Sequence, residues 1–243
     1  MADLSAVRAI VFDLDGTLID SKDDLILSVN ATLVNLGRPS LPDEQIASYI
    51  GQGAPTLIRR ALGDGATDQE CRRGLDFFLA YYETHKMDHT ALYPGVLEGL
   101  EQLAEFPLAI LTNKPARITL RIVQELNLAN LFRVIYGGNS FSTKKPDPLG
   151  MNTILEELGV ASREAVLVGD SEIDVQTARN AGSLAGTVTY GFGVHRLDEF
   201  PPDFFLRSLT DLARMLRHSS SAVPVEDPRY PQTHPRHRRP GRP

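Results

Sequence analysis

Two aspartates, Asp13 and Asp15, directly follow a short apolar run at residues 8–12, and Gly16 comes next. The run predicts a buried strand, so the two carboxylates stand where the chain leaves a hydrophobic environment. Carboxylates in such a place are costly unless a cation or hydrogen bonds satisfy them. Gly16 permits the tight turn that must follow. The pattern therefore indicates a charged site at the carboxyl end of this strand.

Polar segments also follow three further apolar runs that predict strands. These segments are Thr112-Asn113-Lys114, residues 144–148 (KKPDP) and residues 169–174 (GDSEID). In an open α/β sheet, ligands bind at the edge where the strands have their carboxyl ends. We therefore expect these groups to lie together with Asp13 and Asp15.

The side chains expected at this edge indicate phosphoryl transfer. Several oxygen ligands, without cysteine or histidine, favour a hard cation, most simply Mg²⁺. A lysine, a threonine and backbone N–H groups suit a phosphoryl group. One aspartate would be free to act as the nucleophile.

The arrangement of apolar runs predicts an α/β fold with a doubly wound parallel sheet. The predicted strands are 8–12, 108–111, 134–136, 165–168 and 185–189. Helical patterns lie between them or after them, at 96–105, 116–126, 148–158, 174–181 and 209–216. Strands that alternate with helices favour a parallel sheet covered by helices on both faces.

Residues 20–90 interrupt this alternation with helical patterns at 22–36, 44–50, 55–62 and 68–85. We expect an all-helical insertion at 20–91 and an α/β core made of 1–19 and 92–218. The sequence Tyr93-Pro94-Gly95 marks the return to the core. Residues 217–243 carry six arginines and two acidic residues, and we expect a disordered basic tail from residue 219.

Composition excludes several classes of protein. The chain has 243 residues, of which 42% are hydrophobic and 23% charged, as in globular proteins. A net charge of −6 disfavours nucleic acid as a partner, and no apolar run is long enough to span a membrane. A single cysteine, Cys71, excludes internal disulfides. We expect a cytoplasmic protein.

The ordered motifs resemble those of the haloacid dehalogenase superfamily of aspartate-nucleophile hydrolases. The motifs are DLDGT at 13–17, LTN at 111–113, KKPDP at 144–148 and GDSEID at 169–174. The resemblance spans residues 8–216, and the helical insertion lies where that family carries a mobile cap. Residues 49–54 (YIGQGA), 137–141 (GGNSF) and 188–191 (VTYG) are similar to the phosphoglycolate phosphatase branch.

This resemblance implies roles for three aspartates. Asp13 would attack phosphorus and become an aspartyl-phosphate. Asp15 would protonate the leaving alcohol and then deprotonate the water that hydrolyses the intermediate. Mg²⁺ would be held by Asp13, the backbone carbonyl of Asp15, and Asp170. Branches of the family that do not cleave phosphate monoesters lack an aspartate at the position of Asp15.

The resemblance also implies partners for the phosphoryl group. Thr112 and Asn113 would donate hydrogen bonds to its oxygens, and Lys145 would stabilise its negative charge. Asp174 lies one helical turn beyond Asp170 and would support the site by holding Lys145 or a metal-bound water.

Together these roles imply hydrolysis of a small anionic phosphate monoester, 2-phosphoglycolate above others, to glycolate and phosphate. Gln52 and Arg59 in the insertion are candidate substrate contacts. The alternatives are another substrate (a sugar phosphate, a nucleotide or pyrophosphate), a phosphomutase, and a binding module that has lost catalysis. The presence of both Asp13 and Asp15 argues against the last.

Overall fold

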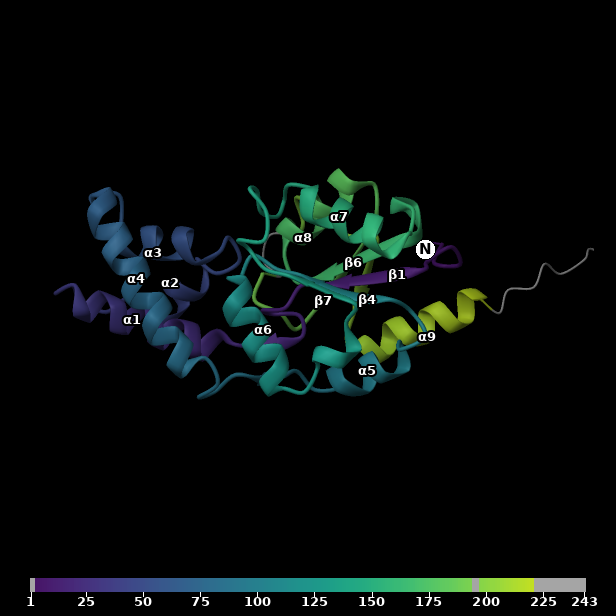
Figure 1. The fold of residues 1–243 in the computed structure, drawn as a ribbon, viewed down its shortest axis with the longest axis horizontal. Helices are drawn as coiled ribbons and strands as arrows, with labels where there is room; N and C mark the ends of the chain where they lie inside the picture. The colour runs from purple at the N-terminus through teal and green to yellow at the C-terminus, as the bar shows by residue number, and fades with distance from the viewer. Residues whose placement is uncertain (1–2, 194–196, 221–243) are drawn as a thin grey trace, which may run out of the picture.

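The computed structural model describes residues 3–193 and 197–220, and a six-stranded sheet forms its centre (Figure 1). The order of the strands is β5-β4-β1-β6-β7-β8, and all neighbouring pairs are parallel. They are β1 (Ala9–Phe12), β4 (Leu108–Leu111), β5 (Val134–Tyr136), β6 (Ala165–Gly169), β7 (Leu184–Val188) and β8 (Phe204–Leu206). The chain builds outward from β1 in both directions, which confirms the predicted doubly wound sheet.

Helices cover both faces of the sheet. Ile10 and Phe12 of β1 point into one apolar cluster, and Ala9 and Val11 point into the other, as the two-residue period of a strand requires. Figure 1 shows α5 (Val96–Gln102), α6 (Ala116–Glu125) and α9 (Leu209–Ser220) on one face, and α7 (Leu149–Leu158) and α8 (Glu172–Ala181) on the other. The sheet is therefore the middle of three layers.

The register of the central strands brings their carboxyl ends level. Phe12 of β1 pairs with Ile110 of β4 on one side and with Val168 of β6 on the other. The residues that follow these three strands must therefore lie side by side at one edge of the sheet.

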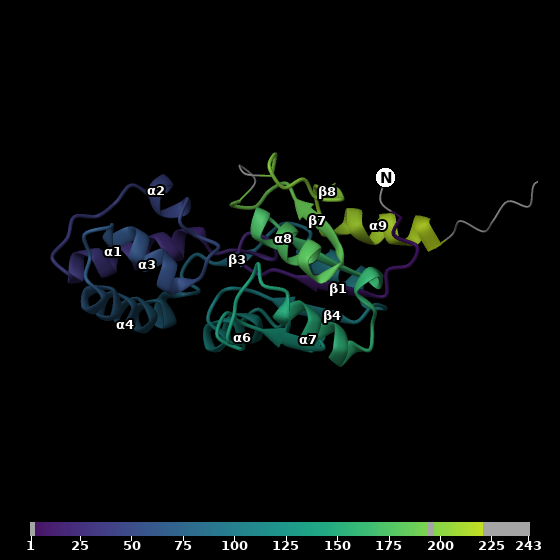
Figure 2. The same cartoon turned by 90° about the horizontal axis from the view of Figure 1, so that it is seen from above.

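The helical insertion, which we define as residues 22–85, lies beyond this edge (Figure 2). Its helices are α1 (Lys22–Asn35), α2 (Asp43–Ala47), α3 (Ala54–Leu62) and α4 (Asp68–His85). The predicted helices are therefore present, although α2 ends three residues earlier than expected. Helix α4 begins with a capping box, in which the Thr67 side chain accepts from the Glu70 backbone and Glu70 accepts from the Thr67 backbone.

Two short connecting segments join the insertion to the sheet and run side by side. Strands β2 (Ile19–Asp20) and β3 (Ala91–Leu92) form an antiparallel pair that the sequence did not predict. Asp24, in the first turn of α1, is 1% exposed and accepts hydrogen bonds from the backbone N–H groups of His89 and Thr90. The start and the end of the insertion are thus fastened to each other.

The structure differs from the sequence prediction at the end of the chain. Strand β8 was not predicted, because it directly follows Pro201-Pro202-Asp203, residue types that indicate a loop, and leaves Phe205 55% exposed. Helix α9 continues to Ser220, past the expected start of the tail, and residues 221–243 lie outside the described residues. None of the helices in the described ranges is long and apolar enough to cross a membrane.

Candidate active site

Asp13 occupies the first position after β1, and its side chain is held in place by backbone and charge. Its own N–H continues the β1–β6 pairing by donating to the Val168 carbonyl at 2.9 Å. Its Oδ1 accepts from the Leu14 N–H at 2.7 Å and lies 2.9 Å from Lys145 Nζ. The strand thus places at the edge of the sheet a carboxylate whose side chain is 12% exposed.

Gly16 allows the loop after β1 to pass directly over Asp170. Its φ is +79°, and a Cβ atom at this position would lie 2.2 Å from Asp170 Oδ2. Both the left-handed conformation and the close approach exclude a side chain.

Three buried carboxylates gather at this edge. Oxygens of Asp13, Asp170 and Asp174 all lie within 4.8 Å of one another. Asp170 Oδ2 is oriented by the backbone N–H groups of Phe192 at 2.6 Å and Gly193 at 3.0 Å. Burial raises the pKa of Asp170 well above its usual value, and repulsion from Asp174 and Asp13 adds to this effect. Burial likewise raises the pKa of Asp13, against the pull of Lys145, to about 6.

A divalent cation fits this donor set. Carboxylate oxygens are the ligands of hard divalent cations, and a cation would offset the repulsion among the three groups. Among the groups at this edge are four carboxyl groups and two lysine ammonium groups, so a doubly charged ion would offset the excess of acidic groups. The carboxylates belong to Asp13, Asp15, Asp170 and Asp174, and the ammonium groups to Lys114 and Lys145.

Both carboxylate oxygens of Asp174 contact groups of the chain, one on Lys145 and the other at the start of α8. Its Oδ1 lies 2.6 Å from Lys145 Nζ, and its Oδ2 accepts from Ser171 Oγ at 2.8 Å. Since both oxygens have partners within the chain, Asp174 positions Lys145 in this structure.

Asn113 fastens two loops together through its side-chain amide. Its Oδ1 accepts from the Lys145 N–H at 3.0 Å, and its Nδ2 donates to the carbonyls of Lys145 and Gly51. Thr112, which is 3% exposed, lines the site directly after β4. The structure therefore places Thr112 at the site as expected, while the Asn113 side chain contacts the backbone of the neighbouring loops.

Sequence reasoning missed an ion pair at Asp15. Lys114 Nζ lies 2.8 Å from Asp15 Oδ1 and 2.6 Å from the hydroxyl of Tyr82, which belongs to α4 of the insertion. Ser21 Oγ donates to the same oxygen of Asp15 at 2.5 Å. Burial acts to lower the pKa of Lys114, but Asp15 and Tyr82 outweigh it and raise the pKa above its usual value. Lys114 is therefore a charged group within the site.

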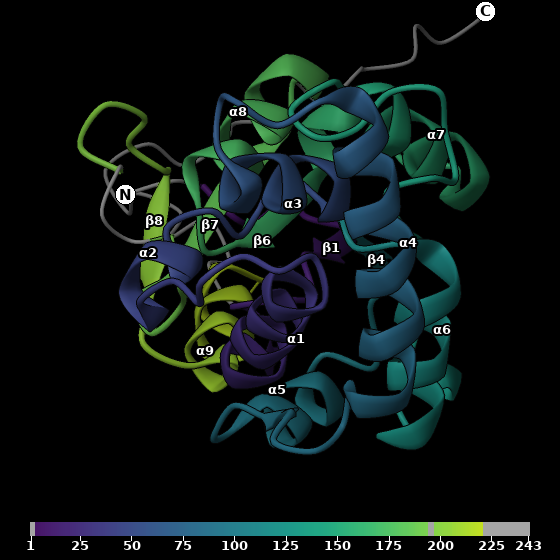
Figure 3. The same cartoon turned by 90° about the vertical axis from the view of Figure 1, so that its left-hand side faces the viewer.

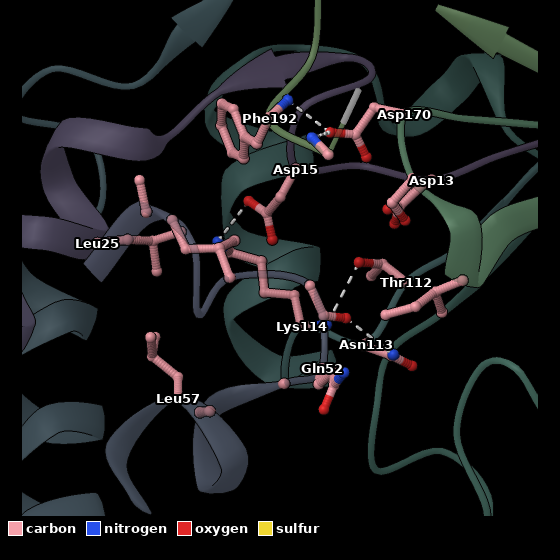
Figure 4. Close-up of a pocket in the computed structure, with 18 of the residues that line it drawn as sticks. Asp13, Asp15, Leu25, Gln52, Leu57, Thr112, Asn113, Lys114, Asp170 and Phe192 are labelled. Carbon is pink, nitrogen blue, oxygen red and sulfur yellow. Dashed lines mark hydrogen bonds and ion pairs between the residues drawn. The ribbon is translucent and has the colours of Figure 1, made fainter. Parts of the chain in front are cut away.

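A cavity of about 210 Å³ separates the sheet edge from the insertion (Figure 4). The core lines it with polar groups, among them Asp13, Asp15, Thr112, Asn113, Lys114 and Asp170. The insertion contributes mostly apolar side chains, including Leu25, Ile50, Leu57 and Phe78. A phosphate ester would find its charged partners on the core side and an apolar wall on the insertion side.

The polar residues that the insertion offers to the cavity include Gln52 and Arg60. Arg60 donates to Gln52 Oε1 at 2.8 Å, and both line the cavity. Arg59, the arginine singled out from the sequence, is not among the lining residues; its side chain is 58% exposed and pairs with Asp68 at 2.8 Å. The structure thus brings Gln52 to the cavity and leaves Arg59 outside it.

The fold and this edge define a class of protein: parallel α/β proteins with an acidic, cation-compatible site at the carboxyl ends of the strands, beneath an inserted group of helices. The sequence profile of the haloacid dehalogenase-like hydrolases matches residues 10–187. The chain belongs to this family, as its motifs predicted.

Relatives with this architecture include several named as phosphatases. The chain is 40% identical over 193 residues to a phosphoglycolate phosphatase of Pseudomonas syringae pv. tomato, covering 76% of this chain and 70% of the relative. It is 36% identical over 225 residues to that of Vibrio parahaemolyticus, covering 88% and 98%. A crystal structure from Haemophilus somnus, described as a predicted phosphoglycolate phosphatase, superposes with a TM-score of 0.82 at 30% identity, covering 86% of this chain and 98% of that one.

Proposed function

We propose that this protein is a Mg²⁺-dependent phosphatase that hydrolyses 2-phosphoglycolate to glycolate and phosphate. The observation that carries the proposal is the buried cluster of Asp13, Asp170 and Asp174 with Lys145, two members of which, Asp13 and Asp170, line a small cavity. Relatives at 36% and 40% identity that bear the name phosphoglycolate phosphatase support the choice of substrate.

Asp13 is the proposed nucleophile. As its carboxylate oxygen forms a bond to phosphorus, the bond from phosphorus to the alcohol oxygen breaks, and Asp15 gives its proton to that oxygen. Asp15 then takes a proton from a water molecule, whose oxygen attacks phosphorus and releases Asp13 and inorganic phosphate. Both aspartates line the cavity, so both can reach a bound ester.

Lys145 and Thr112 stabilise the transferring group. Lys145 Nζ contacts the nucleophile. Its ammonium group can also stabilise the negative charge that develops on the phosphoryl oxygens during the transfer. The Thr112 hydroxyl supplies a neutral hydrogen bond from the end of β4.

Asp13, Asp170 and the backbone carbonyl of Asp15 would hold Mg²⁺. The ion supplies charge neutralisation between the nucleophile and the phosphate when it is bound. The Asp170 side chain is held by two backbone N–H groups, which would orient it as a ligand.

The proposed domains are a catalytic core of residues 1–19 and 92–218 and a cap of residues 20–91. The cap encloses the alcohol part of the substrate. For 2-phosphoglycolate that part carries a carboxylate, and Arg60, held by Gln52, is the cation that the cap offers it. Arg59 is paired with Asp68 outside the cavity, so we assign the carboxylate contact to its neighbour instead.

A phosphate-release panel tests the proposal. Purified protein with Mg²⁺ is offered 2-phosphoglycolate, sugar phosphates, nucleotides and pyrophosphate, and 2-phosphoglycolate should have the highest kcat/KM. Addition of a chelator should remove the activity, and the Asp13→Asn variant sets the background. A higher kcat/KM for another ester would replace the substrate, and no release above the Asp13→Asn background would overturn the activity itself.

A further inference from the structure

A buried lysine links the helical insertion to the proposed acid–base residue. The side chain of Lys114 is 2% exposed, and its Nζ lies between Asp15 Oδ1 at 2.8 Å and the Tyr82 hydroxyl at 2.6 Å. The same Nζ lies 4.6 Å from the centre of the Tyr82 ring. A lysine this deeply buried needs partners for its charge, and here one comes from the core and the other from α4.

The contacts of Asp15 are concentrated on one of its two oxygens. Oδ1 accepts from Lys114 Nζ and from Ser21 Oγ, which lies directly before α1. Two donors on a single oxygen fix the plane of the carboxyl group. The other oxygen, Oδ2, is then the one able to exchange a proton with a leaving alcohol or a water molecule in the cavity.

Tyr82 is itself held against the core. The next residue, Glu83, forms ion pairs with Arg117 and Arg121 of α6. Burial raises the pKa of Tyr82 to about 12, so it remains a neutral phenol whose oxygen accepts from Lys114. The position of the lysine therefore depends on the docking of α4.

We propose that Lys114, placed by Tyr82, is a positioning residue that holds Asp15 in the orientation required to protonate the leaving alcohol. This inference rests on the proposed phosphatase activity but does not depend on which ester is the natural substrate. Through this contact, the docking of the end of α4 against the core adds to the hydrogen bond from Ser21 in orienting Asp15.

The test exploits the fact that proton donation matters for a poor leaving group and hardly at all for a good one. Benzyl phosphate and p-nitrophenyl phosphate have similar size and equal charge, but benzyl alcohol needs a proton to leave and p-nitrophenol does not. We compare kcat/KM, which reports the steps up to departure of the alcohol when that departure is irreversible. A residue that only attracts phosphate would change both esters equally.

Lys114→Met should lower kcat/KM for benzyl phosphate by about 100-fold, at the lower end of the effect of a general acid. The loss for p-nitrophenyl phosphate should stay within about threefold, because its leaving group receives little help from an acid. Asp15→Asn should show the same selectivity. The double variant should lose no more kcat/KM than the more damaging of the two single variants, since both changes act on the same proton transfer.

Arg38→Met is the control. Arg38 is also a partly buried cation of the insertion, but it pairs with Glu70 at 2.8 Å and donates to the Leu62 carbonyl, so both of these partners lie within the insertion and away from Asp15. This variant should keep the wild-type ratio of the two kcat/KM values. If it changes the ratio as Lys114→Met does, or if Lys114→Met slows both esters equally, the inference is wrong.

Tyr82→Phe keeps the test valid if Lys114→Met fails to fold. It removes the phenol oxygen but retains the packed ring, and it should shift the ratio in the same direction by a smaller factor. An unchanged ratio in a folded Tyr82→Phe protein would overturn the role of Tyr82. Wild-type protein that hydrolyses neither these esters nor any compound of the substrate panel would instead refute the phosphatase activity, and the inference with it.

Discussion

The carboxylate of Asp24 fastens the two ends of the helical insertion, and Asp24→Asn tests how much it contributes. It accepts from the backbone N–H groups of His89 and Thr90 and from the Thr90 hydroxyl. Asparagine keeps the shape but replaces one acceptor oxygen by an NH₂ group that faces these donors. Hydrogen bonds to a charged group contribute roughly 1.5–3 kcal/mol each, and about two are lost, so the free energy of unfolding should fall by about 3–6 kcal/mol.

Thermal melting followed by circular dichroism measures this change. In a protein of this size, 1 kcal/mol corresponds to roughly 2–4 °C, so the Tm should fall by roughly 6–24 °C. Asp23→Asn is the matched control, because Asp23 lies in the same helical turn but is exposed, and its Tm should stay within about 2 °C of wild type. Equal Tm values for the two variants would refute the reasoning.

The pH dependence supplies a second test of the same carboxylate. Burial acts to raise the pKa of Asp24, but hydrogen bonds from Thr90 and His89 outweigh it, so the folded pKa lies below the usual value. Such a group stabilises the fold above its unfolded pKa of about 3.9, and this stability is lost as the pH falls through the folded pKa. The difference in unfolding free energy between wild type and Asp24→Asn should therefore have its largest value at about pH 6 and become smaller below about pH 4. A constant difference across this range would mean that the charge is not the cause.

Three further predictions concern the proposed reaction. Asp13→Asn should fold normally and release no phosphate above background, because an amide is a poor nucleophile and the uncatalysed reaction is extremely slow; turnover by this variant would remove Asp13 as the nucleophile. Asp170→Ala should raise the Mg²⁺ concentration required for half-maximal activity by at least ~10-fold, since losing a ligand costs no less than losing a residue that supports one; an unchanged Mg²⁺ titration would exclude Asp170 as a ligand. Arg60→Met should lower kcat/KM for 2-phosphoglycolate by about 10- to 100-fold, the value of a charge-assisted hydrogen bond, and leave p-nitrophenyl phosphate unaffected; the same losses in Arg59→Met would show that the two arginines are not distinguished by the cavity.

The sheet and its edge were predictable because their signals are local. The run before Asp13 is apolar throughout, as a strand buried on both faces must be, and the polar residues after it mark its carboxyl end. The strands β4, β5, β6 and β7 carry the same signal. Strand β8 does not, because it follows Pro201-Pro202-Asp203, residue types that indicate a loop, and because Phe205 is exposed at the end of the sheet.

The contacts between the insertion and the core were not predictable from the sequence. Lys114 and Tyr82 are 32 residues apart and belong to different groups of elements, so their contact depends on how α4 docks against the core. Arg59 and Arg60 are adjacent on α3, and the apolar positions of that helix show which side is buried. They do not show which of the two flanking arginines faces the cavity, since that depends on the angle between α3 and the sheet.

The helical insertion faces the viewer in Figure 3, and its two sides are attached to the core by different kinds of interaction. The end of α4 is held by charge, through Glu83 with Arg117 and Arg121 and through Lys86 with Glu125. The side before α3 is held by a neutral hydrogen bond from Asn113 to the Gly51 carbonyl. We therefore expect α4 to act as the hinge and the Gly51 side to separate first, so that ester and phosphate pass between α3 and the loop after β4. Because salt screens the ion pairs that hold α4 but not the neutral hydrogen bond at Gly51, the rate of this exchange should depend little on ionic strength when the ester concentration is saturating.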